Sequence, residues 1–413
     1  MTVGEQKKLF TKRTIRKASL RGTTVLVRAD YNVPMADGEI EDDFRIRASV
    51  PTLRALLGYG CKIVIVSHLG RPKSADDTAC SLEPVARRLE ELLEHEVCFV
   101  DTCVGPKVRA AVKQAPRVSV TLLENLRFHP EETANDSEFA RQLAQDTAAR
   151  YFVQDGFGVV HRAHASTVAI TQCLPSVAGL LLEKEYISIV GAMQHPRRPL
   201  VALLGGAKVS DKIQIIDKLV HVADQIVIGG AMANTFLAYH GVSVGASKVE
   251  PGQDEAIRAI YDAIAQKVPE NLRDNFLILP TDVAVAASMD DTQPRRVVLL
   301  DEIDENELAL DIGDASIERM VHAIDRAQTV IWNGTLGVAE FAAFAHGSAR
   351  AALELAERPK TTSIIGGGDT ADFVIHWDAR GGESFSHVST GGGASIALMA
   401  GEALPGIEAL LDE

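Results

Sequence analysis

Short runs of β-branched and other apolar residues recur along the chain, and longer stretches with helical apolar spacing lie between them. This alternation is typical of βαβ units, and it predicts parallel sheets covered by helices. The runs fall into two series, which suggests two separate sheets. We expect strands at 24–27, 62–66, 97–100, 119–123 and 151–153 in the first series, and at 200–204, 225–228, 276–279, 297–300, 329–332 and 361–365 in the second.

The chain length also favours two domains, because 413 residues exceed the size at which a single hydrophobic core keeps growing. We therefore expect an α/β protein with two doubly wound parallel-sheet domains of Rossmann-like type. The apolar residues over 180–194 have helical spacing, and this run ends just before Pro196 and Pro199. A hinge helix, placed at 181–195, would join an N-terminal domain at 1–180 to a C-terminal domain at 196–397.

Charge and composition exclude several classes of protein. The formal net charge of −14 argues against a nucleic-acid or anionic-membrane partner, because such partners need a broad basic face. No apolar run approaches the roughly 18 residues of a membrane span, and the first residues lack a signal pattern, so we expect a cytoplasmic protein. The five cysteines contain no C-x-x-C pair, which predicts reduced thiols and neither a disulfide framework nor a zinc site.

Polar side chains follow four strands of the first series, where ligands bind in open parallel sheets. They are Asp30 and Asn32 after the first strand, His68 and Arg71 (with Gly70 between them) after the second, Glu124, Arg127 and His129 after the fourth, and Asp155, His161, Arg162 and His164 after the fifth. With Arg45 and Arg47, this edge would collect five arginines and four histidines. Guanidinium groups bind phosphates and carboxylates bidentately, so we expect a site for a small polyanion. Any one arginine alone could be a solvated surface charge.

Glycine-rich turns follow strands of the second series. The run from Gly205 continues to Lys208 and Lys212, which predicts two ammonium groups on one face of a helix near its positive end. Another run, Gly366 to Gly368, precedes Asp369 and Thr370. Bare backbone N–H groups at a helix N-terminus would cradle phosphates there, and an aspartate among phosphates suggests a Mg²⁺ ligand.

A third glycine run around Gly391 also opens a helix and would offer N–H donors to a transferring phosphoryl group. Each glycine pair alone could serve only a tight turn or close packing. The chain contains neither a P-loop nor a G-x-G-x-x-G motif. Gly241 to Gly245 has the spacing of a nucleophile elbow, but it follows the helical run 232–240, so Gly241 is expected at a helix C-terminus.

Ten ordered motifs together closely resemble the phosphoglycerate kinase family. They are VRADYNVP, RIRASVPTL, SHLGRP, ENLRFH, DGFGVVHRAHAS, LLGGAKVSDKI, LPTDVAVA, WNGTLGVAE, GGGDTA and FSHVSTGGGASIALMAGEALPG, and they cover nearly the whole chain. The resemblance implies a glycolytic phosphotransferase that moves a phosphoryl group from 1,3-bisphosphoglycerate to ADP, giving 3-phosphoglycerate and ATP. It also implies Mg²⁺, a monomer, domain closure, and packing of residues 398–413 on the N-terminal domain.

The resemblance also implies residue roles in the N-terminal domain. Asp30 and Asn32 would hold the hydroxyl and carboxyl end of the acid, and Arg45 would lie nearest the phosphoryl in flight. The group expected to hold the distal phosphate comprises His68, Arg71, Arg127 and Arg162, and Leu69 and Gly70 are also expected to bind the substrate.

In the C-terminal domain, Lys208 and Lys212 would meet the nucleotide phosphates, Glu340 the ribose and Asp369 the metal. Asn333, Gly367, Gly368 and Thr370 would surround the phosphate tail, with Gly368 and Gly391 donating to the transferring group.

Some positions depart from the family pattern. Thr335 stands where the family commonly has proline, and Ala339 replaces a bulky phenylalanine before Glu340. Val159, Val160 and Gly191 also differ from the usual residues. Two alternatives remain: another two-domain kinase that acts on a carboxylate, or a non-catalytic anion- and nucleotide-binding protein. The second would be expected to have lost Arg45, Lys208 or Asp369, and all three are present.

Overall fold

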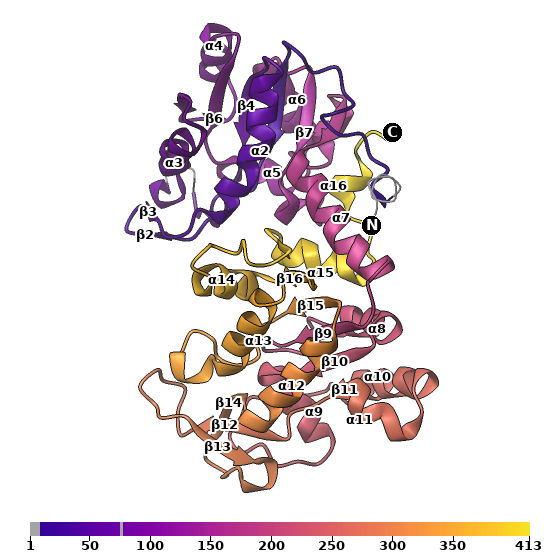
Figure 1. The fold of residues 1–413 in the computed structure, drawn as a ribbon. Helices are drawn as coiled ribbons and strands as arrows, with labels where there is room; N and C mark the ends of the chain where they lie inside the picture. The colour runs from indigo at the N-terminus through magenta and orange to yellow at the C-terminus, as the bar shows by residue number, and fades with distance from the viewer. Residues whose placement is uncertain (1–8, 75–76) are drawn as a thin grey trace. The chain divides into compact units, whose positions relative to one another are not determined.

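The computed structural model describes residues 9–74 and 77–413 (Figure 1). The chain divides into two compact units, of which unit 1 comprises Met1–Ile187 with Ala403–Glu413 and unit 2 comprises Ser188–Glu402. Each unit contains a six-stranded parallel sheet, so the predicted fold class is confirmed. Within the described ranges, no helix combines the length and apolar character that crossing a bilayer requires.

The sheet of unit 1 has the order β5-β6-β4-β1-β7-β8. Its strands are β1 (Thr24–Arg28), β4 (Lys62–Val66), β5 (Val97–Val100), β6 (Ser119–Leu123), β7 (Tyr151–Gln154) and β8 (Ser176–Ala178). Val25 and Val27 face one core cluster, whereas Leu26 faces another. Both faces of the sheet are therefore covered. This explains why the strands appear in the sequence as continuous apolar runs instead of alternating apolar and polar residues. The five predicted strands of this series are confirmed, and β8 was not predicted.

Helices cover both faces of this sheet. They are α2 (Phe44–Gly58), α3 (Glu83–Leu93), α4 (Pro106–Gln114), α5 (Pro130–Thr133) and α6 (Ser137–Asp146), and a two-stranded ribbon joins β2 (Met35–Ala36) to β3 (Glu39–Ile40). The apolar sides of α2 and α3 pack in the cluster around Val25, while those of α4 and α6 pack in the cluster around Leu26.

The helix predicted over 180–194 is present as α7 (Leu180–Gln194). No side chain at Gly179 can cap it, and its first N–H groups are satisfied from elsewhere in unit 1. Leu180 N donates to Thr52 Oγ1 at 3.0 Å, and Leu181 N donates to Asp155 Oδ1 at 3.0 Å. Burial raises the pKa of the Asp155 carboxyl to about 7.

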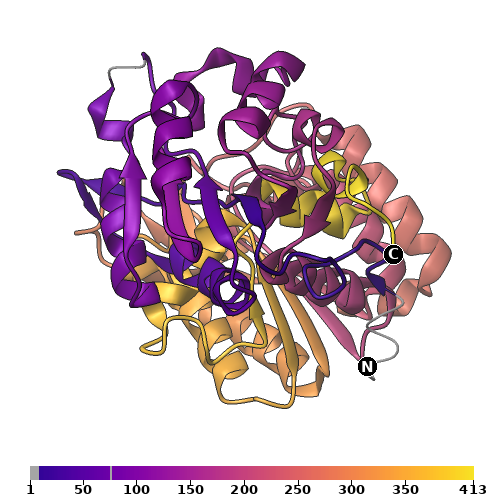
Figure 2. The ribbon, with the colours of Figure 1, turned by 90° about the horizontal axis from the view of Figure 1, so that it is seen from above.

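The last residues of the chain belong to unit 1, where α16 (Pro405–Glu408) lies. Gly406 N donates to Val160 O at 2.9 Å and Leu411 N donates to Ser176 O at 3.0 Å. Arg13 N in turn donates to Leu411 O at 2.7 Å, so the yellow terminal segment runs beside the first described residues (Figure 2).

The parallel sheet of unit 2 has the order β11-β10-β9-β15-β16-β17. Its strands are β9 (Leu200–Leu204), β10 (Gln225–Ile228), β11 (Leu277–Ile278), β15 (Thr329–Asn333), β16 (Thr362–Gly366) and β17 (His387–Val388). The helices of this unit, beyond the end of α7, are α8 (Ile213–Val222), α9 (Gly230–Tyr239), α10 (Asp254–Lys267), α11 (Arg273–Phe276), α12 (Asp314–Arg326), α13 (His346–Ala356), α14 (Gly368–Trp377) and α15 (Gly392–Ala400).

One predicted strand belongs to a different sheet. The run at 297–300 corresponds to β13 (Arg296–Leu299), but this strand pairs antiparallel with β12 (Asp282–Ala286), which also pairs with β14 (Leu308–Ile312). Its assignment to the parallel series is therefore wrong. Antiparallel neighbours need only short connections, and strand periodicity alone does not distinguish the two kinds of sheet.

The helix α9 ends at Tyr239, and Gly241 follows with φ +78° while its N donates to Ala238 O at 2.9 Å. The predicted helix C-terminus at Gly241 is thus confirmed, and the nucleophile-elbow interpretation is excluded.

Candidate active site

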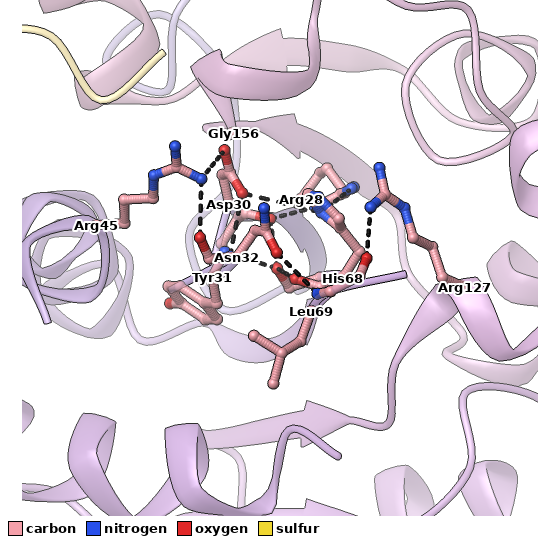
Figure 3. A network of polar contacts seen from close by, with 12 residues as sticks. Arg28, Asp30, Tyr31, Asn32, Arg45, His68, Leu69, Arg127 and Gly156 are labelled. Carbon is pink, nitrogen blue, oxygen red and sulfur yellow. Dashed lines mark hydrogen bonds and ion pairs between the residues drawn. The ribbon is translucent and has the colours of Figure 1, made fainter. Parts of the chain in front are cut away.

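The first half of the site lies in unit 1, where β1 is flanked by β4 and β7. Residues that follow these parallel strands must emerge at one edge of the sheet. Figure 3 shows Asp30, Asn32, His68 and Leu69 close together there, with Arg45 and Arg127 reaching the group from opposite sides.

Asn32 ties the loops after β1 and β4 together. Its Oδ1 accepts a hydrogen bond from Gly70 N at 2.7 Å, and its carbonyl oxygen accepts one from Arg45 Nη1 at 2.9 Å. The same Arg45 nitrogen lies 3.4 Å from Asp30 Oδ2. The side chain of Arg45, in the first turn of α2, is thus held over the β1 loop in a half-buried position.

The loop at Leu69 and Gly70 is fixed by donors from the segment after β6. Arg127 Nη1 donates to Gly70 O at 2.6 Å, and Asn125 Nδ2 donates to Leu69 O at 2.7 Å. Gly70 has φ +62°, and a Cβ placed on it would lie 2.8 Å from Cys80 Sγ. Glycine is therefore required here both by conformation and by space.

His68 is buried, and its tautomer is set by a neighbour. Burial, and then the guanidinium groups of Arg28 and Arg127, hold the pKa of His68 well below its usual range, so the ring is neutral. Arg28 Nη2 lies 3.1 Å from His68 Nδ1, and a guanidinium can only donate. Nδ1 is therefore the acceptor, Nε2 carries the proton, and the 3.8 Å separation from Asp30 Oδ1 is not an ion pair.

Arg28 was not predicted as a site residue. Its side chain is 1% exposed, and its Nε donates to Ser166 Oγ at 2.7 Å. The signal was available in the sequence, because an arginine within the buried run TVLVR needs a partner or a function.

Other members of the predicted basic set are used differently. Arg71 and Arg162 are exposed, and Arg162 Nε donates to His161 Nε2 at 3.1 Å. Arg47 does not join the group, because its Nε donates to Asp43 Oδ1 at 2.6 Å, and His129 stacks on Phe139 with ring centroids 5.0 Å apart. Arg47 and His129 thus have partners other than the residues of this group.

In unit 2, Lys208 and Lys212 do not share a helix face. Lys212 N donates to Val209 O at 2.9 Å in a turn, Val209 is fully buried, and α8 begins only at Ile213. The helix prediction for these lysines is wrong, because the chain forms a turn there and both lysines precede the first residue of α8. Lys208 is exposed, whereas Lys212 Nζ is buried and donates to Asn333 Oδ1. Burial lowers the pKa of Lys212 to about 8, although the carboxylates of Asp211 and Asp369 oppose this shift.

Three glycine turns of unit 2 pack backbone against backbone. A Cβ on Gly205 would lie 2.0 Å from Thr335 O, and one on Gly334 would lie 2.2 Å from Gly205 O. One on Gly230 would lie 2.7 Å from Gly206 N. These glycines are therefore needed for packing.

The glycines after β16 have a different environment. Gly367 has φ +95° and precedes α14, and a Cβ on it would lie 3.3 Å from Asn333 Nδ2. That amide nitrogen is buried, and among the described residues it has no hydrogen-bond partner. A Cβ on Gly368 would meet nothing within 4 Å, whereas one on Gly392, at the start of α15, would lie 3.4 Å from Gly368 N. Two helix N-termini thus meet beside an unsatisfied donor, which is an arrangement that suits a phosphate chain.

Thr370 is turned inward, and its Oγ1 accepts a hydrogen bond from Gly334 N at 2.6 Å. Asp369 is exposed in the first turn of α14, and Glu340 is exposed in the turn after β15. The part of the chain that the structure describes holds no cluster of three or more His, Cys, Asp or Glu residues able to bind a metal alone. Asp369 has the hard oxygen ligand that Mg²⁺ prefers, and one carboxylate plus substrate phosphates is its usual coordination.

Comparison with known proteins gives a consistent result. The family model described as phosphoglycerate kinase matches residues 15–402. A phosphoglycerate kinase of Pelotomaculum thermopropionicum is 46% identical, and the match covers 98% of this chain and 100% of that protein. One of Rubrobacter xylanophilus is 45% identical, and the match covers 97% of this chain and 98% of that protein. The solved phosphoglycerate kinase structure from Coxiella burnetii has a TM-score of 0.81 and 33% identity over 96% of this chain and 98% of its own. That from Pyrococcus horikoshii has a TM-score of 0.82 and 30% identity over the same shares.

Proposed function

The chain belongs to the phosphoglycerate kinase family, and from this premise we propose how its residues divide the reaction. The enzyme is a glycolytic phosphotransferase with a carboxyl group as acceptor, and it transfers a phosphoryl group between 1,3-bisphosphoglycerate and ADP. The observation that carries the residue assignment is the pair of dissimilar anion sites, one rich in guanidinium groups in unit 1 and one built from helix N-termini in unit 2.

The acid is assigned to unit 1. The neutral His68 ring offers an Nε2–H donor, and Arg127, Arg162 and Arg71 supply charge for the phosphate that does not react. Leu69 and Gly70 shape the loop beneath it. Asp30 and Asn32 would receive the hydroxyl and carboxyl end, next to Arg45.

The nucleotide is assigned to unit 2. Asn333 Nδ2 and the N–H groups at Gly367 and Gly368 would bind the phosphate chain together with Lys208 and Lys212. Glu340 would bind the ribose, while Thr370 supports the cradle through Gly334. Asp369 would hold Mg²⁺, which neutralises phosphate charge when bound.

The transfer is a direct in-line displacement. An oxygen of the ADP β-phosphate attacks the acyl phosphorus, the bond from phosphorus to the carboxyl oxygen breaks, and its electron pair leaves on the carboxylate of 3-phosphoglycerate. Arg45, Lys208 and the backbone donors at Gly368 and Gly391 would stabilise the charge on the equatorial oxygens. No side chain needs to be phosphorylated. A coupled assay with 3-phosphoglycerate and Mg-ATP tests the activity, and absence of turnover would contradict it.

We also propose that the protein acts as a cytoplasmic monomer without a nucleic-acid or membrane partner. Its net charge of −14 supports the last part, because no broad basic face is expected. Sedimentation analysis of the full chain would test the monomer.

Domain closure is a first prediction, because the proposed acid and nucleotide residues belong to different units. Closure would align the reactants and exclude the water that could hydrolyse the acyl phosphate. Small-angle scattering with both substrates at saturation should show a smaller radius of gyration than the free protein. An unchanged radius would contradict closure.

The second prediction concerns Ala339, where the family usually has a phenylalanine ring. The neighbouring Val338 and Phe341 pack on a small apolar cluster that contains Leu310 and Phe344, so a larger side chain would extend this surface towards Glu340. Ala339→Phe should tighten ADP binding by roughly threefold to tenfold in calorimetry, because it adds apolar contact area. Equal or weaker ADP binding by a folded variant would show that Ala339 does not limit affinity.

A further inference from the structure

A buried carboxylate lies beneath the arginines of unit 1. Glu132, in the short helix α5, is 1% exposed. Its Oε1 accepts a hydrogen bond from Ser166 Oγ at 2.6 Å, and its Oε2 accepts one from Ser166 N at 3.0 Å. Oε1 also lies 4.0 Å from Arg28 Nη2 and 3.7 Å from His164 Nδ1. Both carboxylate oxygens are therefore used within the protein.

The cationic groups of the site repel one another when no anion is bound. Burial and the charges of Arg28 and Arg162 lower the pKa of Arg127, while the carboxylates of Asp30 and Glu132 oppose the shift. The same two carboxylates oppose the effect of burial on the pKa of Arg28. Asp30 lies 3.4 Å from Arg45, whereas Glu132 lies 4.0 Å from Arg28 and opposes the effect of burial on the pKa of Arg28 more strongly than Asp30 does.

Glu132 also fixes the backbone that carries Arg162. Its carbonyl oxygen accepts a hydrogen bond from Ala165 N at 2.9 Å, in addition to the two bonds from Ser166. Thr167 Oγ1 donates to Arg162 O at 2.8 Å within the same segment. A second path runs through the Ser166 hydroxyl, which accepts from Arg28 Nε, and Arg28 in turn sets the tautomer of His68.

We propose that Glu132 is a positioning residue for the acid substrate: its buried charge holds Ser166 and Arg28, and through them His68 and the Arg162 segment, in the geometry that binds the anion. This proposal rests on the assignment of the acid to unit 1. It predicts that loss of the Glu132 charge weakens binding of the anionic substrate, whereas electrostatics alone would strengthen it. Removal of a negative charge would by itself make the site more positive and bind a polyanion more tightly, whereas loss of positioning weakens binding.

The test is Glu132→Gln in the full chain, with steady-state kinetics in 3-phosphoglycerate and Mg-ATP. Glutamine keeps the size but presents an N–H group to donors that need an acceptor. We expect the KM for 3-phosphoglycerate to rise about tenfold, since hydrogen bonds to a buried charge are lost. The KM for Mg-ATP and kcat should stay unchanged. Glu131→Gln, an exposed neighbour with the same change in charge, is the matched control and should leave both KM values unchanged.

Ser166→Ala keeps the charge and removes the hydroxyl between Glu132 and Arg28. It should raise the same KM by a smaller factor, and the double variant should resemble Glu132→Gln alone, because the two residues act in one chain. An unchanged or lower KM for 3-phosphoglycerate in Glu132→Gln, a rise in both KM values, or additive effects would overturn the proposal. If Glu132→Gln does not fold, an unchanged KM in Ser166→Ala overturns it. Arg127→Ala distinguishes failure of this proposal from failure of the proposed function. If that variant also binds 3-phosphoglycerate normally, the assignment of the acid to unit 1 is itself wrong.

Discussion

Arg45→Ala and Lys208→Ala are each expected to lower kcat by about 10²- to 10³-fold, the loss typical of one preorganised donor to a transition state. Arg45 is held over the β1 loop by Asn32 O and Asp30, and its half-buried position keeps the guanidinium oriented before substrate arrives. Lys208 is exposed on the turn before α8, so its ammonium group is accessible to a bound phosphate. Both would interact more strongly as charge spreads onto the equatorial oxygens, so their loss should affect the rate more than substrate binding.

Arg127→Ala provides the contrast. Arg127 is assigned to a phosphate whose charge is constant during the reaction, and it also holds Gly70 O at 2.6 Å. Its loss should raise the KM for 3-phosphoglycerate by about tenfold or more, with a smaller change in kcat. Steady-state kinetics in both substrates would decide, provided that circular dichroism shows all three variants folded. A loss mainly of kcat in Arg127→Ala, together with a loss mainly of affinity in Lys208→Ala, would show that the roles are assigned wrongly.

Gly205→Ala is expected to destabilise unit 2 by at least about 3 kcal/mol, at the upper end of the cost of overpacking. The added Cβ would lie 2.0 Å from Thr335 O. That oxygen accepts a hydrogen bond from Gly206 N at 2.9 Å, and the turn at 334–335 also packs against Gly230. The contact cannot be relieved by rotation of a side chain, so the ends of β9 and β15 would have to separate.

Denaturant unfolding followed by tryptophan fluorescence measures this effect, because both tryptophans of the chain, Trp332 and Trp377, belong to unit 2. Gly368→Ala is the matched control for stability, since nothing lies within 4 Å of a Cβ at that helical position. It should unfold at the same or a higher denaturant concentration than the parent protein. Equal stability of the Gly205 and Gly368 variants would show that the backbone at 334–335 can move away from an added Cβ at little cost in stability.

Much of the fold could be predicted from the sequence, because buried parallel strands appear as uninterrupted apolar runs between helical stretches. The strands that were missed explain the limits. β8 and β17 are only three and two residues long, too short to show a period. β12 and β14 lie in the antiparallel sheet, and their pairing depends on contacts distant in sequence, which local pattern does not encode.

The site could be predicted only as far as its residues stand directly after strands. Asp30, Asn32, His68 and Arg127 were found in this way, and the structure brings them together with Arg45. Arg28 and Glu132 were missed, because one lies inside a strand and the other in a short helix, and their relation arises only from folding. The two lysines after β9 were found, but the helix predicted to carry both was wrong, because α8 begins only at Ile213.

Unit 1 consists of two stretches of chain that flank the whole of unit 2. During translation, its sheet therefore emerges from the ribosome first, but residues 403–413 emerge only after unit 2 has been made. Those residues contribute the buried side chains of Leu404, Ile407 and Leu410 and the bond from Gly406 N to Val160 O, just before His161 and Arg162. Until then the nascent unit 1 exposes an apolar surface that a chaperone could bind, and the segment that carries Arg162 gains this support only after unit 2 has been synthesised.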